Sequence, residues 1–283
     1  MTKPRPLHHH GNVPVLEVAE KLNLPIIEVS NKKESTDKVI AAHFSSRLGV
    51  LIDFGILIEQ KVIDSFSLGI VNSHFSLLPQ WRGADPITFS ILSGQSKTGV
   101  SLMLLVEAMD EGPLLAVSEM DVPPGTTTPE LTQNLIELSD TLLKDVLPKY
   151  TAGKLTGSSQ EKIAETVGYS ARPTYSRKLT KEDGILDWRT PAKQLEREIR
   201  AYIEWPKSRC ILGGHAVIVT ASHVITDEQH SVGSKQSPGS ILVVNKTLTI
   251  QTSDGKLAID RIKPAGKHEM SIDAFLNGYG KDL

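Results

Sequence analysis

The fold is decided by residues 69–112, which read GIVNSHFSLLPQWRGADPITFSILSGQSKTGVSLMLLVEAMDEG. The segment opens at Gly69 with apolar residues that favour a short strand. A turn follows, and residues 84–93 have the pattern of a helix. Residues 99–106 favour a second strand, which leads into Met-Asp-Glu-Gly at 109–112. This order of strand, helix and strand predicts one α/β unit, and such folds carry their chemistry on loops at strand ends.

Three polar side chains stand at the ends of these neighbouring elements. Asn72 and His74 are two residues apart, so an extended backbone projects them from the same face. Asp110 follows the second strand. Each residue is ordinary when taken alone, because an Asn often caps a turn, a His at a strand end is most often structural, and an Asp before a turn glycine is common. The combination, rather than any single residue, predicts a functional site.

The combination also has a specific spacing. Residues 72–86 spell N-x-H-x-S-L-L-P-x-x-R-G-x-x-P, and a D-x-G sequence begins 36 residues after His74. This pattern resembles the signature of the 10-formyltetrahydrofolate-dependent formyltransferases. The resemblance implies a Rossmann-like catalytic domain, 10-formyltetrahydrofolate as the formyl donor and co-substrate, and no metal ion.

The resemblance further implies the roles of individual residues. Asn72 would donate a hydrogen bond to the oxyanion, and His74, whose side-chain pKa is naturally near neutrality, would assist the transfer of the amine proton. Asp110 would orient His74 and raise its basicity. The segment that contacts the folate would be Ser76, Leu77, Leu78 and Pro79. Arg82 would either anchor the turn or contact the tRNA acceptor end, and the structural role is favoured.

The N-terminal half alternates short strands and helices. Over residues 1–153 this alternation predicts a doubly wound, mostly parallel sheet. Residues 25–29 read as a strand, residues 31–35 as a polar loop and residues 38–44 as a helix. In the formyltransferases a strand and a helix precede this region, and residues 2–6 (Thr-Lys-Pro-Arg-Pro) resemble the loop that comes after them. We therefore expect the opening βαβ unit of the family to be missing from this chain.

The C-terminal half is expected to form a second domain. Residues 154–172 read as a linker, and residues 173–283 hold short strands between Gly- and Asn-containing turns, which favours a small OB-like β-barrel. The sequences K-L-x-K-E-D-x-x-x-D-W from Lys178 and P-A-G-K-x-x-M from Pro264 resemble the C-terminal domain of the methionyl-tRNA formyltransferases. This resemblance implies formylation of initiator methionyl-tRNA for translation initiation.

Charge is distributed unevenly between the halves. Residues 1–150 carry 12 Lys and Arg against 18 Asp and Glu, a net charge of −6, whereas residues 151–283 carry 19 against 15, a net charge of +4. A basic half suits a polyanionic partner such as RNA, although ordinary surface charge accounts for this mild asymmetry equally well. The basic residues expected to contact tRNA phosphates are Arg177, Lys178, Lys207, Arg209, Lys263 and Lys267. In the family the N-terminal loop also meets the acceptor stem, and here that loop is residues 3–12.

Composition restricts the compartment. Cys210 is the one cysteine, so the chain forms no internal disulfide, which fits a reducing cytosol. The longest apolar stretch, residues 49–58, contains Asp53 and is too short to span a bilayer. Met1 is not followed by the apolar segment of a signal peptide. We therefore expect a cytoplasmic enzyme without membrane partners, acting as a monomer.

Two other functions stay open. The first is a formyltransferase that acts on an amino sugar or a nucleotide acceptor, and the predicted C-terminal barrel argues against it. The second is a truncated, catalytically dead relative that only binds tRNA. Intact Asn72, His74 and Asp110 argue against that alternative, whereas a missing βαβ unit argues for it.

Overall fold

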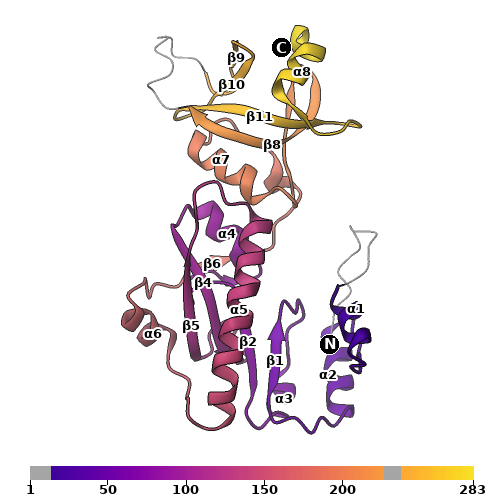
Figure 1. The fold of residues 1–283 in the computed structure, drawn as a ribbon, viewed down its shortest axis with the longest axis vertical. Helices are drawn as coiled ribbons and strands as arrows, with labels where there is room; N and C mark the ends of the chain where they lie inside the picture. Colours follow the sequence, from indigo (N-terminus) through magenta and orange to yellow (C-terminus); the bar gives the residue numbers. More distant parts are fainter. Residues whose placement is uncertain (1–13, 226–236) are drawn as a thin grey trace. The chain divides into compact units, whose positions relative to one another are not determined.

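The computed structural model describes residues 14–225 and 237–283 (Figure 1). The expected contact of loop 3–12 with tRNA therefore lies outside the described residues. Contacts divide the chain into two compact units. Unit 1 comprises the residues up to Ala84 together with Gly99–Glu119 and Glu137–Tyr175, and unit 2 comprises Asp85–Thr98, Met120–Ile136 and Ser176–Leu283.

A four-stranded sheet forms the centre of the N-terminal half. Its strand order is β1 (Gly49–Ile52), β2 (Ile70–His74), β4 (Lys97–Leu104) and β5 (Leu114–Asp121). β1 runs parallel to β2, whereas β4 runs antiparallel to β2, so the sheet is mixed. All five residues of β2 are buried, as expected for the middle of a sheet covered by helices. The predicted α/β, Rossmann-like fold class is confirmed.

Helices accompany this sheet (Figure 1). Those with residues in unit 1 are α1 (Pro14–Lys21), α2 (Lys32–Ala41), α3 (Gln60–Ile63), α5 (Thr128–Thr151) and α6 (Gln160–Val167). α5 lies against one face of the sheet, because the Ser139 and Ser73 hydroxyl groups are 2.7 Å apart and both residues are buried. A short ladder joins β3 (Arg82–Gly83) to β6 (Tyr175–Ser176).

Two expectations for residues 25–44 are wrong. Residues 31–35 are not a loop, because the Asn31 side chain accepts a hydrogen bond from Glu34 N at 2.9 Å and so starts α2 at Lys32. Residues 25–29 do not form a strand either, and only Glu28 makes a single bridge. An apolar, β-branched run favours a strand only where a neighbouring strand completes its hydrogen bonds, and the sequence pattern does not contain that information.

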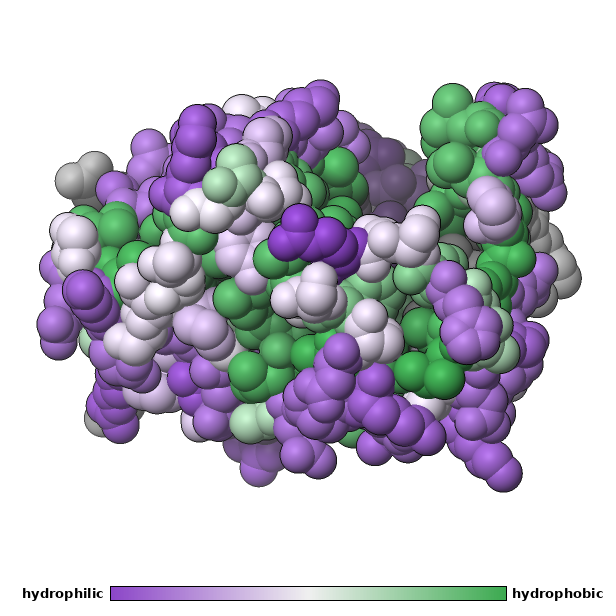
Figure 2. Space-filling view, turned by 90° about the horizontal axis from the view of Figure 1, so that it is seen from below, coloured by the Kyte–Doolittle hydropathy of each residue, from purple (hydrophilic) through white to green (hydrophobic). Residues whose placement is uncertain are grey.

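Apolar side chains reach the surface in the same part of the chain. β1 is the edge strand of the sheet, and its Val50 and Ile52 are 47% and 49% exposed. Further large apolar residues between positions 15 and 57 are exposed as well: Val15, Val18, Leu22, Leu24, Ile26, Ile40, Phe44 and Leu57. Figure 2 shows apolar areas among the hydrophilic surface on the face that it presents.

The C-terminal part is an antiparallel sheet with helices, which agrees with the predicted second fold. The strand order is β7 (Ser208–Leu212), β8 (His215–Ile225), β11 (Lys256–Pro264), β10 (Thr247–Gln251) and β9 (Ile241–Val244), and β12 (Met270–Ser271) pairs with β11. Register shifts between Ile259 and Ile262 mark a bulge in β11. The helical elements that lie wholly in unit 2 are α4 (Pro86–Ser93), α7 (Ala192–Ala201), α8 (Ile272–Tyr279), η1 (Glu182–Gly184) and η2 (Gly280–Asp282), and α5 begins there.

One apolar core holds this second unit together. Leu195 and Ile199 of α7, Val217 and Val219 of β8, and Phe275 of α8 belong to the same buried cluster. The sequence reading missed α8, whose start is capped by the Ser271 hydroxyl, which accepts from Ala274 N at 3.3 Å. Asp85 likewise caps α4 by accepting from Thr88 N at 3.4 Å, so its carboxylate has a structural role at that helix start.

Candidate active site at the end of the second strand

The last residues of β2 present an amide and an imidazole on one side of the sheet. Asn72 lies between Leu51 of β1 and Met103 of β4, and His74 lies opposite Ser101. Ser73, between them, points to the other face, toward α5. Asn72 is 9% exposed and His74 is 7% exposed. The alternation predicted from the spacing of two is therefore present, and both groups are largely withdrawn from water.

A backbone carbonyl fixes the protonation pattern of His74. The ring atom Nε2 lies 3.0 Å from the carbonyl oxygen of Trp81. Because a carbonyl oxygen only accepts hydrogen bonds, Nε2 must carry the proton. In the neutral ring the other nitrogen, Nδ1, then carries a lone pair. Nδ1 lies 3.8 Å from Oδ1 of Asp110, which is longer than a direct hydrogen bond.

The Trp81 carbonyl is itself held in place. Trp81 has a left-handed backbone conformation with φ of 55°, which is costly for a bulky residue. Its N–H donates to the Thr174 hydroxyl at 2.9 Å, and the N–H of Arg82 donates to the Thr174 carbonyl at 3.0 Å. These two bonds stabilise the turn that orients His74.

Asp110 lies on the loop after β4 in a conformation that two glycines permit. Its φ is 54°, and its Oδ2 accepts from the N–H of Gly83 at 2.7 Å. At Gly112 a Cβ atom would lie 1.8 Å from the carbonyl oxygen of Leu104, so only glycine fits there. Gly83 of the R-G pair and Asp110 of the D-x-G sequence are thus joined by a hydrogen bond.

Electrostatics favour a neutral His74. Burial lowers the pKa of the imidazole below its ordinary value, and the Asp110 carboxylate and the hydrogen bond to Trp81 oppose this effect only in part. The expectation of a pKa near neutrality is therefore corrected, because the ring lies inside the protein. A neutral imidazole with a lone pair on Nδ1 is a proton acceptor, and a nearby carboxylate stabilises the cation that it forms.

The Asn72 amide differs from the other polar groups of the site in its hydrogen bonds. Within the described part of the chain its side chain makes no hydrogen bond to another residue. A nearly buried amide without a protein partner suits a donor for an oxygen that becomes negative during a reaction. The geometry thus brings an amide, an imidazole with a free lone pair and a carboxylate together at the end of β2.

The predicted folate segment is buried. All four of its residues are buried: Ser76, Leu77, Leu78 and Pro79. Leu78 belongs to an apolar cluster with Met103 and Leu114. The Ser101 hydroxyl holds the turn, since it donates to the carbonyl of Ser76 at 2.7 Å and accepts from the N–H of Leu78 at 3.0 Å. The Leu78–Pro79 peptide bond is cis. The side chains of this segment pack inside the protein.

Arg82 is a structural residue in this geometry, as favoured from the sequence. It is 7% exposed, and its Nη1 lies 3.2 Å from Oε1 of Glu111. Its Nε and Nη2 donate to Oε1 of Gln160 at 3.2 and 2.8 Å. Gln160, Thr174 and Ser101 were missed by the sequence reading. Gln160 and Thr174 fall in or beside residues 154–172, which read as linker, and no local pattern connects them with residues 74–110.

The six predicted RNA-contacting residues all lie in the C-terminal unit. Arg209 and Lys263 share a row across the sheet, because both are paired with Ile218 of β8. Arg177 differs, since its guanidinium makes a bidentate ion pair with Asp183 and its charge is neutralised. Lys178, Lys207 and Lys267 are exposed. The contacts among the described residues do not join these six side chains into one patch.

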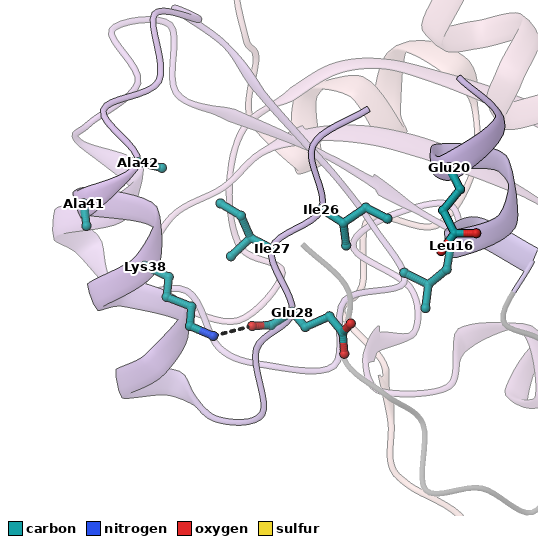
Figure 3. Close-up of a pocket in the computed structure, with 8 residues that line it drawn as sticks. All are labelled: Leu16, Glu20, Ile26, Ile27, Glu28, Lys38, Ala41 and Ala42. Atoms are coloured by element: carbon teal, nitrogen blue, oxygen red, sulfur yellow. Dashed lines mark hydrogen bonds between the residues drawn. The ribbon is translucent and has the colours of Figure 1, made fainter. Parts of the chain in front are cut away.

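A hollow in the described surface lies away from these residues. A hollow of about 550 Å³ lies between α1, residues 26–28 and α2, where Lys38 Nζ donates to the carbonyl of Glu28 at 2.8 Å (Figure 3). None of its lining residues is a predicted site residue. Across residues 14–225 and 237–283, no three His, Cys, Asp or Glu side chains group as metal ligands would. In the same residues no helix has the length and apolar character needed to cross a bilayer.

Comparisons with known proteins show the family. Residues 7–147 match the family described as "Formyl transferase", and residues 178–280 match "Formyl transferase, C-terminal domain". A curated relative, the methionyl-tRNA formyltransferase of Roseiflexus castenholzii, is 33% identical over 257 residues, which cover 91% of this chain and 78% of the relative.

Two solved structures share the fold. HypX from Aquifex aeolicus in complex with tetrahydrofolic acid has a TM-score of 0.60 at 16% identity, and the match covers 94% of this chain and 44% of HypX. The N-formyltransferase from Helicobacter canadensis in complex with folinic acid and dTDP-3-aminofucose has a TM-score of 0.62 at 15% identity, over 87% of this chain and 81% of that enzyme. At such identities the likeness concerns the fold alone.

Proposed function

The chain belongs to the formyltransferase family, and from this premise we propose that it transfers a formyl group from 10-formyltetrahydrofolate to the amino group of initiator methionyl-tRNA. The observation that carries the choice of acceptor is the relatedness to a methionyl-tRNA formyltransferase over 91% of the chain, which includes the C-terminal part. The reaction takes place in the cytosol during translation initiation, with the enzyme acting as a monomer of two domains.

The catalytic residues of this proposal are Asn72, His74 and Asp110. Bound 10-formyltetrahydrofolate supplies the formyl carbon that the amine attacks. The Asn72 amide donates a hydrogen bond to the formyl oxygen as negative charge develops there. The site fits such a group, because Asn72 is nearly buried and its amide has no partner among the described residues.

Proton transfer in this proposal runs through Nδ1 of His74. Nε2 is engaged with the Trp81 carbonyl, so Nδ1 is the atom that accepts the proton from the attacking amine. Asp110, 3.8 Å away, stabilises the imidazolium that results. When the bond between the formyl carbon and the donor nitrogen breaks, the imidazolium returns the proton to that leaving nitrogen. The new carbon–nitrogen bond replaces the broken one, and His74 is neutral again.

The folate would lie beside residues 76–79. Because Ser76, Leu77, Leu78 and Pro79 are buried, their contribution is a rigid wall and backbone groups next to His74 rather than flexible side-chain contacts. The Ser101 hydroxyl fixes this wall through its two hydrogen bonds to the turn.

Transfer RNA would contact basic residues of the C-terminal sheet. Residues directly opposite one another in an antiparallel sheet project to the same face, so Arg209, Ile218 and Lys263 share a face. The neighbours Val217 and Val219 of Ile218 belong to the core, which makes the Ile218 face the outer one. Lys263 is exposed and suits a phosphate contact, whereas the Arg209 guanidinium donates to the Lys181 carbonyl and its Nε is buried, so Arg209 contributes less than Lys263. Arg177, paired with Asp183, contributes less.

A competition between acceptors tests the proposal. The 283-residue chain is incubated with 10-formyltetrahydrofolate and equimolar methionyl-initiator-tRNA and a dTDP-amino sugar, and both formylated products are quantified. We expect formyl-methionyl-tRNA as the dominant product. Formylation of the amino sugar alone would favour an amino-sugar acceptor, the class to which the dTDP-3-aminofucose bound by the Helicobacter canadensis enzyme belongs. Binding of tRNA without formylation of either acceptor would favour a non-catalytic RNA-binding relative.

A further inference from the structure

We infer that Gln160, at the first position of α6, is a positioning residue that holds the Asp110 loop in its reactive geometry. This inference rests on the proposed function, because it gives Gln160 a task only if Asp110 acts on His74. Gln160 is 2% exposed, although glutamine is usually a surface residue. Its side chain meets residues 48 to 78 positions earlier in the chain, around the candidate site.

Every hydrogen-bonding atom of the Gln160 amide is used. Nε2 donates to the backbone carbonyls of Asp110 at 2.8 Å and Gly112 at 3.0 Å. Oε1 accepts from Nε and Nη2 of Arg82 at 3.2 and 2.8 Å. An amide is the side chain that offers donors on one side and an acceptor on the other, so a carboxylate or an apolar group of the same shape cannot make all four bonds.

These bonds support a residue with an unfavourable backbone conformation. Asp110 has a left-handed backbone, which costs a non-glycine residue on the order of 1 kcal/mol or more. The N–H of Gly83 holds its carboxylate, and Gln160 holds its carbonyl. Arg82, directly before Gly83, bonds to the same Gln160 amide. Asp110 is thus fixed at both its side chain and its backbone by one closed set of contacts.

The element that carries Gln160 is firmly docked. Ser158 exchanges two backbone hydrogen bonds with Leu114, at 2.8 and 2.9 Å. The Ser159 hydroxyl caps α6 by accepting from Lys162 N, and Ala164 is fully buried. Ile163 packs against the apolar cluster that contains Leu78 and Leu114. A side chain on such an element can hold a loop to within the small tolerance that catalysis requires.

Replacement of Gln160 should therefore weaken the influence of Asp110 on His74. The Asp110 carboxylate contacts Gly83 N and lies 3.8 Å from His74 Nδ1, and the neighbouring Arg82 pairs with Glu111 while it is held by Gln160. If Asp110 moves away, the imidazolium loses its nearest anion. Protonation of His74 then requires a lower pH, so the acid limb of the pH–rate profile moves to lower pH and the plateau rate falls.

The test compares Gln160→Met and Gln160→Glu with Asp110→Asn and a matched control. Met keeps the size of the side chain and loses all four bonds, whereas Glu keeps the contact with Arg82 and loses the two donated bonds. The control is Gln251→Met in β10, because Gln251 Nε2 also donates to two backbone carbonyls, those of Thr252 and Gly255, within the C-terminal sheet. Measured are the pH profile of kcat/KM for formyl transfer and the thermal midpoint of each variant.

We expect both Gln160 variants to lose roughly 10- to 100-fold in kcat/KM, since a misplacement near 1 Å can cost that much. Their acid limbs should shift in the direction of Asp110→Asn. Gln251→Met should lower the thermal midpoint and leave the acid limb unchanged. If Asp110→Asn shifts the limb and neither Gln160 variant does, Gln160 is only structural and the proposed function stands. If Asp110→Asn leaves both rate and limb unchanged, the proposed role of the pair fails, and the role of Gln160 fails with it.

Discussion

Nδ1 of His74 lies 3.8 Å from Oδ1 of Asp110, with the other ring nitrogen bonded to the Trp81 carbonyl. The separation is too long for a direct hydrogen bond and short enough for a strong charge interaction in a buried place. The lone pair on Nδ1 and the carboxylate repel each other while the ring is neutral. Protonation of Nδ1 turns this repulsion into an attraction. The pair is therefore arranged to accept a proton, which is what attack by an amine requires.

Loss of the Asn72 amide should affect the rate more than binding. Asn72→Ala removes the donor that meets the developing oxyanion, and removal of one such donor typically costs about 10²- to 10³-fold in kcat. The dissociation constant of the folate should change by less than about threefold, because the amide acts mainly on charge that appears during reaction. The control is Asn277→Ala on the exposed surface of α8. A kcat within threefold of the parent would contradict the assigned role.

The rate should fall on the acid side below the ordinary His pKa of about 6.5. Burial lowers the pKa of His74, so the ring stays neutral, and able to accept a proton, to a lower pH than a free histidine. Asp110→Asn should move this acid limb still lower, because the carboxylate favours the protonated ring. The measurement is the pH dependence of kcat/KM. An acid limb above 6.5 would show that the ring is stabilised as a cation instead.

The same burial makes stability depend on pH. The pKa of His74 is lower in the folded than in the unfolded chain, so the unfolded chain binds a proton first as pH falls. The free energy of unfolding should therefore decrease as pH drops below about 6.5. Urea unfolding of the parent and of His74→Gln at several pH values checks this. The His74→Gln variant should have the smaller decrease over that range, and an equal decrease would contradict the prediction.

The Ser101 hydroxyl should contribute more to the free energy of unfolding than the hydroxyl of an exposed serine. Ser101→Ala leaves the N–H of Leu78 and the carbonyl of Ser76 without partners in the interior, which costs about 1–3 kcal/mol. Folate affinity should fall as well, because the turn at residues 76–79 loosens. Ser65→Ala, at an exposed position, is the control and should stay within about 0.5 kcal/mol. Equal stability of the two variants would refute the role of Ser101.

Replacing the exposed Lys263 by Ala should weaken tRNA binding without changing the rate at saturation, and Arg209→Ala should weaken it less, because the Arg209 guanidinium already donates to the Lys181 carbonyl. Each contact with a phosphate contributes a slope of about −0.9 to the dependence of log K on log salt, so Lys263→Ala should reduce the slope by about one. Arg177→Ala should change the slope less, because Asp183 already neutralises that charge. Binding titrations over 50–200 mM salt, the range in which phosphate contacts matter, measure the slopes. A larger effect at Arg177 than at Lys263 would contradict the assignment.

Much of the fold followed from local sequence patterns. β2, α4 and β4 were predicted near their observed positions, because each has an apolar run or a helical pattern bounded by Gly or Pro. The spacing of two between Asn72 and His74 correctly predicted that both side chains project from one face of β2. Helix α2 was misread at its start, since the capping role of Asn31 depends on a side-chain bond to Glu34 N.

The support of the site could not be predicted in the same way. Gln160 and Thr174 act on residues about 50 to 90 positions away, and nothing next to them in the sequence marks those partners. The tautomer of His74 depends on the Trp81 carbonyl, which is a backbone group and has no residue signature. Contacts of this kind require the tertiary structure, because they connect segments that only the fold brings together.

The most direct test of the central claim is formyl transfer from 10-formyltetrahydrofolate to methionyl-initiator-tRNA, measured for the 283-residue chain beside His74→Ala. The account predicts turnover by the parent chain and a loss of at least about 100-fold in the variant, since a general base contributes about 10²- to 10⁴-fold. Formylation by the variant at the parent rate, or no turnover by the parent under conditions where it binds both folate and tRNA, would contradict the assignment of His74 as the base of a methionyl-tRNA formyltransferase.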